Sequence, residues 1–135
     1  MVLSSSAQHV TVSILFDSHP IVVSVVYAKC NYLERRELWS QLQLDLPTDD
    51  PWLCIGDFNI IREDMEQRGG RPRLWVAMED FNDFIDSCGL TEMKSVGSKF
   101  SWCNGQKGMA CSCSKLDRCL LNPVAASLMF EAFVK

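Results

Sequence analysis

The sequence predicts a mixed α/β fold, and three features of its hydrophobic pattern support that prediction. Two strand-like stretches, 10–16 and 21–26, follow each other across a short turn and predict an antiparallel hairpin. The apolar run 52–55 is typical of a buried strand in a parallel sheet. Amphipathic segments at 31–46 and 76–88 predict helices that cover such a sheet.

The two predicted helices have recognisable ends. Asn31 can cap the first helix, with Glu34 three residues later as in a capping box, and Pro47 follows its last turn. The apolar stripe of this helix leaves Arg35 largely outside it. Gly89 suits the position after the second helix, where a left-handed backbone is common.

The other segments give weaker signals. Residues 1–8 are small and polar and predict a frayed end, whereas the β-branched run 21–26 predicts a strand covered on both faces. The charged segment 60–74 predicts a loop. Further expectations are short strands at 91–93, 100–102 and 116–121, a loop at 106–114, and a last helix that begins at Pro123 and is capped by Asn122.

Two polar residues follow the predicted strand 52–55 and are candidates for chemistry. Asp57 and Asn59 are two apart, so in extended chain they point the same way while Phe58 turns into the core. A carboxylate can take a proton from water, and an amide can hold water or a phosphate oxygen, which suits phosphate-ester hydrolysis. The alternative is a strand-exit turn in which both side chains bond to nearby backbone.

Composition fits one globular domain of 135 residues and gives no global sign of nucleic-acid binding. The net charge is −4, so positive charge is only local. Such a local group could hold a phosphate backbone, or it could consist of solvated loop charges. Its members are Arg62, Arg68, Arg71, Arg73, Lys94, Lys99, Lys107, Lys115 and Arg118.

Three stretches in order make the sequence resemble a known family. They are Gly56-Asp57-Phe58-Asn59, Val25-Val26-Tyr27 with Arg35, Leu38 and Trp39 downstream, and Ser114-Lys115-Leu116-Asp117-Arg118 followed by Leu120, Leu121, Asn122 and Pro123. Together they resemble the endonuclease/exonuclease/phosphatase family, which includes the exonuclease III-like enzymes. The greatest similarity is to the endonuclease domains of plant LINE-type (non-LTR) retrotransposons, and it extends from about residue 10 to residue 130.

The resemblance implies a four-layer α/β sandwich and Mg²⁺-dependent hydrolysis of phosphodiesters in DNA. Asp57 and Asn59 would activate and position the attacking water. Tyr27 would lie at the active site, where its phenol can donate to a phosphate oxygen; otherwise it is a half-buried tyrosine with its hydroxyl in water. Asp117 would orient a catalytic histidine, or without the family it would be an ordinary ion-paired residue.

The sequence also departs from the family pattern. No residues match the strands that supply an asparagine and a metal-binding glutamate, nor the final Ser-Asp-His motif, so 1–135 is expected to be a partial domain. The metal ligands are therefore unknown, with Asp57 as one option. The only histidines are His9 and His19, and a strand-end or turn role is the better expectation for each.

Two functions from different classes follow. The first is a retrotransposon-derived endonuclease-like domain that acts on DNA and is inactive as this isolated chain. The second is a non-catalytic remnant that at most binds nucleic acid or a protein partner. The oligomeric state is not predicted.

Cysteine usage and hydropathy give an expected location. Seven cysteines are an odd number, and the cluster 103–119 lacks the paired spacing of a zinc site, so free thiols are expected. No secretory signal or membrane-spanning stretch is visible. We therefore expect an intracellular protein, with the nucleus as one compartment.

Overall fold

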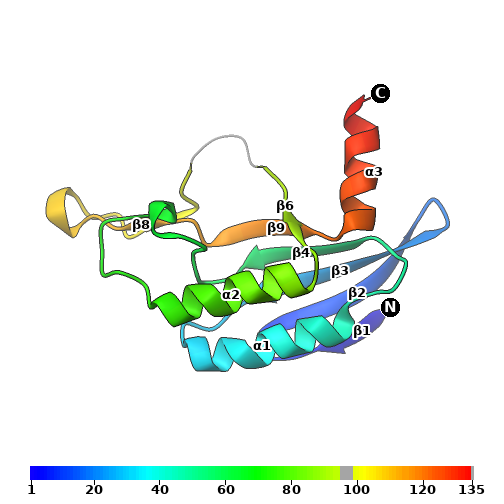
Figure 1. Ribbon diagram of the computed structural model, residues 1–135, viewed down its shortest axis with the longest axis horizontal. Coiled ribbons are helices and arrows are strands. Elements are labelled where there is room, and N and C mark those ends of the chain that lie inside the picture. Colours follow the sequence, from blue (N-terminus) through cyan, green and yellow to red (C-terminus); the bar gives the residue numbers. More distant parts are fainter. Residues whose placement is uncertain (95–98, 135) are drawn as a thin grey trace.

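The computed structural model describes residues 1–94 and 99–134 and has the mixed α/β architecture that the sequence predicts (Figure 1). The strands are β1 Val2–Ser5, β2 His9–Phe16, β3 His19–Tyr27, β4 Trp52–Asp57, β5 Gln67–Arg68, β6 Thr91–Glu92, β7 Trp102–Cys103, β8 Cys113–Ser114 and β9 Asp117–Leu121. The helices are α1 Tyr32–Asp45, α2 Trp75–Ser87 and α3 Pro123–Val134, with short 3₁₀ turns η1 Asp64–Glu66 and η2 Gly108–Ala110.

One mixed sheet organises the chain. Its strand order is β1-β2-β3-β4-β9-β6, and β3 and β4 are parallel while the other neighbours are antiparallel. Helices α1 and α2 lie side by side against one face, and α3 stands at one end of the sheet (Figure 1). A second small sheet, β5-β8-β7, projects from the end of the main sheet where β3 and β4 finish.

The space between the helices and the sheet is filled by stacked aromatic rings. Trp39 of α1 stacks on Phe81 and Phe84 of α2, with ring centroids 5.2 and 5.0 Å apart. Phe58, just after β4, lies 5.3 Å from Phe81 and is fully buried. Because aromatic rings bury large apolar areas, this cluster fixes both helices and the end of β4 together.

The opposite face of the sheet is open, which corrects the expectation that 21–26 is covered on both faces. Val22 and Val26 are buried beneath the helices, but Val25 is 46% exposed. Alternate residues of a strand point to opposite faces, and among the described residues helices cover one face along most of the sheet. The β-branched run therefore reflects one buried face and one apolar, open face.

The N-terminal segment is also ordered, so the expectation of a frayed end at 1–8 was wrong. Strand β1 pairs with β2 at the edge of the sheet, and the amino group of Met1 donates to the carbonyl oxygen of Ser13 at 2.9 Å. The sequence Val-Leu-Ser-Ser of β1 shows no apolar alternation, because Ser4 bonds to Asp45 of α1 while Val2 and Leu3 are exposed.

The predicted helix ends are confirmed. The Asn31 side chain accepts from the amide of Leu33 at 2.8 Å, and the Asn122 side chain accepts from the amide of Ala125 at 2.9 Å. Gly89 has a φ of 64° after α2. Arg35 was placed outside the apolar stripe, but it is only 3% exposed because its guanidinium donates to the carbonyls that precede α1.

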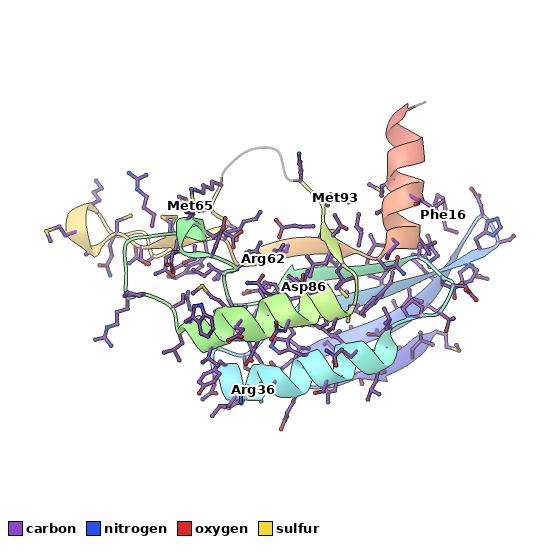
Figure 2. All side chains as sticks on the ribbon, viewed as in Figure 1. Phe16, Arg36, Arg62, Met65, Asp86 and Met93 are labelled. Atoms are coloured by element: carbon purple, nitrogen blue, oxygen red, sulfur yellow. A yellow bond between two sulfur atoms is a disulfide. The ribbon has the colours of Figure 1, made fainter. Side chains whose placement is uncertain are left out.

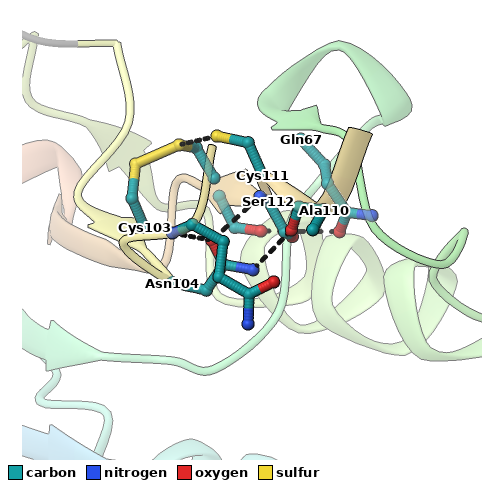
Figure 3. The surroundings of a disulfide bond; sticks show 9 residues. Gln67, Cys103, Asn104, Ala110, Cys111 and Ser112 are labelled. Carbon is teal, nitrogen blue, oxygen red and sulfur yellow. Dashed lines mark hydrogen bonds between the residues drawn. A yellow bond between two sulfur atoms is a disulfide. The ribbon is translucent and has the colours of Figure 1, made fainter. Parts of the chain in front are cut away.

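A disulfide corrects the expectation of free thiols. Cys103 and Cys113 are directly opposed in β7 and β8, with Cα atoms 4.1 Å apart, and their sulfurs are bonded (Figure 3). The Sγ of Cys111 lies 4.0 Å from that of Cys113. The bond closes the 104–112 turn at the base of the hairpin. The other described cysteines, Cys30, Cys54, Cys88, Cys111 and Cys119, are unpaired.

No helix formed by the described residues is long and apolar enough to cross a bilayer.

A buried polar network joins the N-terminal strands to α1. The Asp45 carboxylate accepts from Ser4 at 2.7 Å and from Thr11 at 2.6 Å, and it lies 3.0 Å from Nε2 of His9. Thr11 also bonds to Ser24 at 2.7 Å. The Nε1 of Trp52 donates to Ser24 at 2.9 Å and completes the chain. His9 therefore has the strand-end role expected for it.

We expect Asp45→Ala to lower the free energy of unfolding by about 2 to 4 kcal/mol, because it leaves buried donors on His9 and Thr11 without their acceptor. Urea denaturation followed by circular dichroism measures this change. Asp49→Ala, at an exposed position in the loop after α1, is the matched control and should change stability by less than about 0.5 kcal/mol. Equal effects of the two substitutions would contradict the role of the network.

Candidate active site

Three of the four predicted site residues lie in one row across the main sheet. Tyr27 of β3 is the register partner of Asp57 of β4, and Asp57 is the register partner of Asp117 of β9. Residues that are directly opposed in neighbouring strands point to the same face. The row therefore lies at one end of three neighbouring strands, on the open face, and the register places Tyr27, Asp57 and Asp117 next to one another.

Gly56 allows the strands to approach closely at this row. Its φ is 137°, and a Cβ atom there would overlap the carbonyl oxygen of Val26 in β3. No other residue type fits this position without moving β3. Immediately after it, Asp57 turns to the open face and Phe58 into the aromatic core.

Asn59 takes a left-handed backbone conformation with a φ of 56°, which asparagine tolerates better than most residues. Its amide N–H donates to Oδ1 of Asp57 at 2.8 Å. Its side-chain Nδ2 donates to the carbonyl of Ala28 at 3.1 Å and lies 3.3 Å from the Sγ of Cys30. These bonds match the strand-exit turn that was the alternative interpretation, so both residues have a structural role.

The structural role does not use all the bonding capacity of Asp57. None of the hydrogen bonds among the described residues involves its Oδ2. Burial raises the pKa of the Asp57 carboxyl, the hydrogen bond from Asn59 works against that rise, and the charge of Asp117 adds to it. A carboxylate with a raised pKa and one uncommitted oxygen is suited to accept a proton.

Arg118 does not pair with its neighbour Asp117, because alternate residues of β9 point to opposite faces. It is 5% exposed on the helix side, where it forms ion pairs with Glu66 and Glu92. Glu92 also pairs with Lys115 at 2.6 Å. Burial alone lowers the pKa of Arg118, but the bonds to both glutamates outweigh it and raise that pKa. The network ties the loop 60–74 to β9 and β6.

Two of the four arginines in 60–74 donate hydrogen bonds to the side chains of other residues. Nε of Arg62 donates to the side chain of Asn82 in α2 at 2.7 Å (Figure 2). Nε of Arg73 donates to Oε1 of Gln67 at 2.9 Å.

The loop prediction for 60–74 missed the turn η1 and the strand β5, which pairs with β8. Strands of two residues are too short to show a hydrophobic period.

The expected cleft is only partly present. Asp117 lines a cavity of about 260 Å³ with Gly56, Lys115 and Arg118, whereas the row itself lies on the open sheet face. Neither histidine is in the row: His9 is buried under α1, and His19 begins β3 at its opposite end.

The side chains present do not by themselves make a metal centre. Among residues 1–94 and 99–134, no three histidine, cysteine, aspartate or glutamate side chains are grouped closely enough to hold a metal ion. Asp57 and Asp117 supply two carboxylates of the kind that Mg²⁺ prefers, but a third protein ligand is missing from this part of the chain.

Comparison with solved structures identifies the fold. No family model matches the sequence, and no curated protein matches it significantly. The endonuclease domain of TRAS1, a telomere-specific non-LTR retrotransposon, has a TM-score of 0.68 and 12% identity over 92% of this chain and 54% of that one. The 3′ phosphatase NExo from Neisseria, bound to a product DNA hairpin, has a TM-score of 0.60 and 16% identity over 93% and 56%.

A third structure supports the same fold. An endonuclease/exonuclease/phosphatase family protein from Leptotrichia buccalis has a TM-score of 0.50 and 16% identity over 90% of this chain and 47% of that one. The chain therefore has the α/β fold found in endonuclease/exonuclease/phosphatase proteins, including a retrotransposon endonuclease domain. It spans about half the length of the structures it matches.

We expect Asp57→Asn to raise the melting temperature at neutral pH. The pKa of Asp57 is raised in the folded state, so folding favours its protonated form, and stability falls as pH rises from the unfolded to the folded pKa. Asparagine removes that penalty and keeps an acceptor for the amide of Asn59. The advantage should shrink as the pH is lowered through the carboxyl range, measured by thermal unfolding from pH 3 to 7.

Asp83→Asn, on the exposed face of α2, is the control for loss of one negative charge. The expectation fails if Asp57→Asn is no more stable than this control at pH 7, or if its advantage is independent of pH.

Proposed function

We propose that this chain supplies one half of a phosphodiesterase active site that acts on DNA. The observation that carries the proposal is the row Tyr27–Asp57–Asp117, which has two carboxylates and a phenol on one sheet face at the ends of three adjacent strands. The shared fold with a retrotransposon endonuclease domain and a DNA-bound 3′ phosphatase supports the same function.

The proposed roles follow from the chemistry of each group. Asp57 accepts the proton of the attacking water through Oδ2. Its neighbour Asn59 fixes the position of that carboxylate by donating its backbone N–H to Oδ1. The exposed hydroxyl of Tyr27 donates to a phosphate oxygen. Asp117 orients a catalytic histidine supplied from outside the described residues, since neither His9 nor His19 lies near it.

Hydrolysis therefore requires groups in addition to this half. Mg²⁺ would have only Asp57, Asp117, water and the phosphate itself as ligands here, so we propose that a complementing segment contributes a further carboxylate and a histidine. The open sheet face beside the row gives such a segment apolar strands to pack against.

The alternative is a non-catalytic nucleic-acid or protein binding module derived from a retrotransposon. The observation in its favour is that Asp57 and Asn59 are both used to close the strand-exit turn. A binding module would need the turn but would be indifferent to the identity of Asp117. The two functions therefore differ in their response to changes at that residue.

The 135 residues alone should not nick supercoiled plasmid or abasic-site DNA in the presence of Mg²⁺ above a protein-free blank. Loss of a residue that acts with others as a unit typically lowers kcat by several orders of magnitude. Gel electrophoresis of plasmid after incubation measures the nicking. Robust nicking that disappears in Asp57→Ala would contradict this expectation.

A chimera tests the proposed function directly. This chain would replace the matched half of the TRAS1 endonuclease domain, and the folded product should nick plasmid DNA. Asp57→Ala should abolish the activity, and Asp117→Asn should reduce it about 100-fold or more because the residue it orients loses its partner. A folded chimera that does not nick plasmid would favour the binding module, and an active chimera that is unchanged by Asp117→Asn would contradict the orienting role of Asp117.

A further inference from the structure

A second concave site lies beside the row, between the start of α1, the loop 60–74 and the β7–β8 hairpin. It has a volume of about 440 Å³, which is within the range of ligand pockets. Its lining includes three arginines and two aromatic residues. They are Arg35, Arg71, Arg73, Tyr32 and Trp102.

The pocket has an unbalanced positive charge. None of the described residues that line it is an aspartate or a glutamate. Burial lowers the pKa of Arg35, and the charge of Arg73 lowers it further. The charge of the Asp80 carboxylate opposes this lowering of the pKa, but Asp80 already accepts a hydrogen bond from Nε of Arg36 at 2.8 Å. An anion between the two guanidinium groups would relieve their repulsion.

The two inner arginines are held in place before any ligand binds. The Nη1 of Arg35 donates to the carbonyls of Lys29 at 2.9 Å and Cys30 at 2.7 Å. The Nε of Arg73 donates to Gln67 at 2.9 Å, and the Gln67 amide in turn donates to the carbonyl of Arg71 at 2.6 Å. A fixed guanidinium pair binds an oxyanion at a lower cost in side-chain entropy.

The β7–β8 hairpin contributes an aromatic side chain, Trp102, to the lining of the pocket. Trp102 is 46% exposed, although its neighbour Cys103 is tied to Cys113. The loop and hairpin are packed against each other at Gly69, where a Cβ atom would overlap the carbonyl oxygen of Cys111. Trp102 therefore presents an exposed indole on a hairpin that is held in place by the disulfide and by the packing at Gly69. Nucleobases stack on exposed aromatic side chains of this kind.

The pocket lies next to the strand exit that carries the candidate active site. Cys30 lines the pocket, and its Sγ lies 3.3 Å from Nδ2 of Asn59. Asp57 does not line the pocket, so a strand that occupies both sites would pass Asn59 and Cys30.

We propose that this pocket binds one nucleotide of a nucleic-acid strand, with its phosphate on Arg35 and Arg73 and its base against Trp102. The inference rests on the proposed function, since it places a neighbouring nucleotide of the same strand at Asp57. The pocket positions the strand and takes no part in bond cleavage.

Fluorescence anisotropy with a labelled single-stranded DNA 12-mer, in buffer without divalent metal, tests the proposal on the full chain. Arg73→Gln and Trp102→Ala should each weaken binding roughly tenfold, the size typical of one lost phosphate contact or one lost base stack. Arg68→Gln removes the same charge from the same loop outside the pocket and should change affinity by less than about twofold. Circular dichroism checks that each variant is folded.

The substitutions should also differ in kind. Arg73→Gln should reduce the slope of log affinity against log salt by about one, and Trp102→Ala should leave it unchanged. A further test uses a series of 12-mers that each lack one base. At one position, the missing base should weaken binding to the unsubstituted protein as much as Trp102→Ala weakens binding to the intact 12-mer. The same missing base should not change the affinity of the Trp102→Ala variant, because that variant has already lost the base stack.

Several outcomes would overturn the inference. They are no measurable binding of the 12-mer at low salt, equal effects of Arg73→Gln and Arg68→Gln, or an abasic cost that adds to that of Trp102→Ala. If micromolar nucleoside monophosphate displaces the 12-mer and inorganic phosphate does not, the pocket binds a free nucleotide. That result would overturn the proposal that the pocket binds a nucleotide within a strand. Cleavage by the chimera through Asp57 reports separately on the proposed function, so the two can fail independently.

Discussion

The packing of Phe58 into the aromatic cluster is the interaction on which the rest of the site depends. This fully buried ring contacts α1 and α2 through Trp39 and Phe81, and it lies between the two polar residues of the strand exit. Because neighbouring side chains in extended backbone alternate, an anchored Phe58 forces Asp57 to the opposite face. The core of the domain thus sets the direction of the candidate catalytic carboxylate.

The same residues hold the backbone of the strand exit and form the candidate site, and this overlap limits which residue types fit these positions. Asn59 is needed for a left-handed turn and for two side-chain contacts, and Gly56 for close contact with β3. Such a turn persists only when its surroundings hold it. Here the surroundings are the carbonyl of Ala28 and the carboxylate of Asp57, so the turn and the site form together.

The elements with long periodic patterns could be predicted from the sequence, and those with short or one-sided patterns could not. The caps Asn31 and Asn122 act through single local hydrogen bonds, which a sequence motif records well. β1 was missed because this edge strand contacts α1 through the hydroxyl of Ser4 and so shows no apolar alternation. The pairing of Cys103 with Cys113 depends on the register of a two-residue hairpin ladder, which no local pattern defines.

The candidate site, like the fold, has one part that could be predicted from the sequence and one part that could not. The row of Tyr27, Asp57 and Asp117 follows from three motifs that each end or begin a strand, so its members could be found in the sequence. The pocket of Arg35, Arg71 and Arg73 could not be found there, because it joins a helix start to a loop that is distant in the chain. Arg35 in particular has the spacing of a solvated helix residue and is buried by bonds to backbone carbonyls.

The ion pairs of Arg118 also have a consequence for strand register. A slip of β9 by one residue along β4 would exchange its two faces and bring Arg118 into the row in place of Asp117. The site would then gain a cation where it now has an anion. The ion pairs of Arg118 with Glu66 and Glu92 on the helix side oppose that slip, since the slip would take the guanidinium away from both glutamates. A buried salt bridge on one face of the sheet thereby determines the sign of the charge presented on the other.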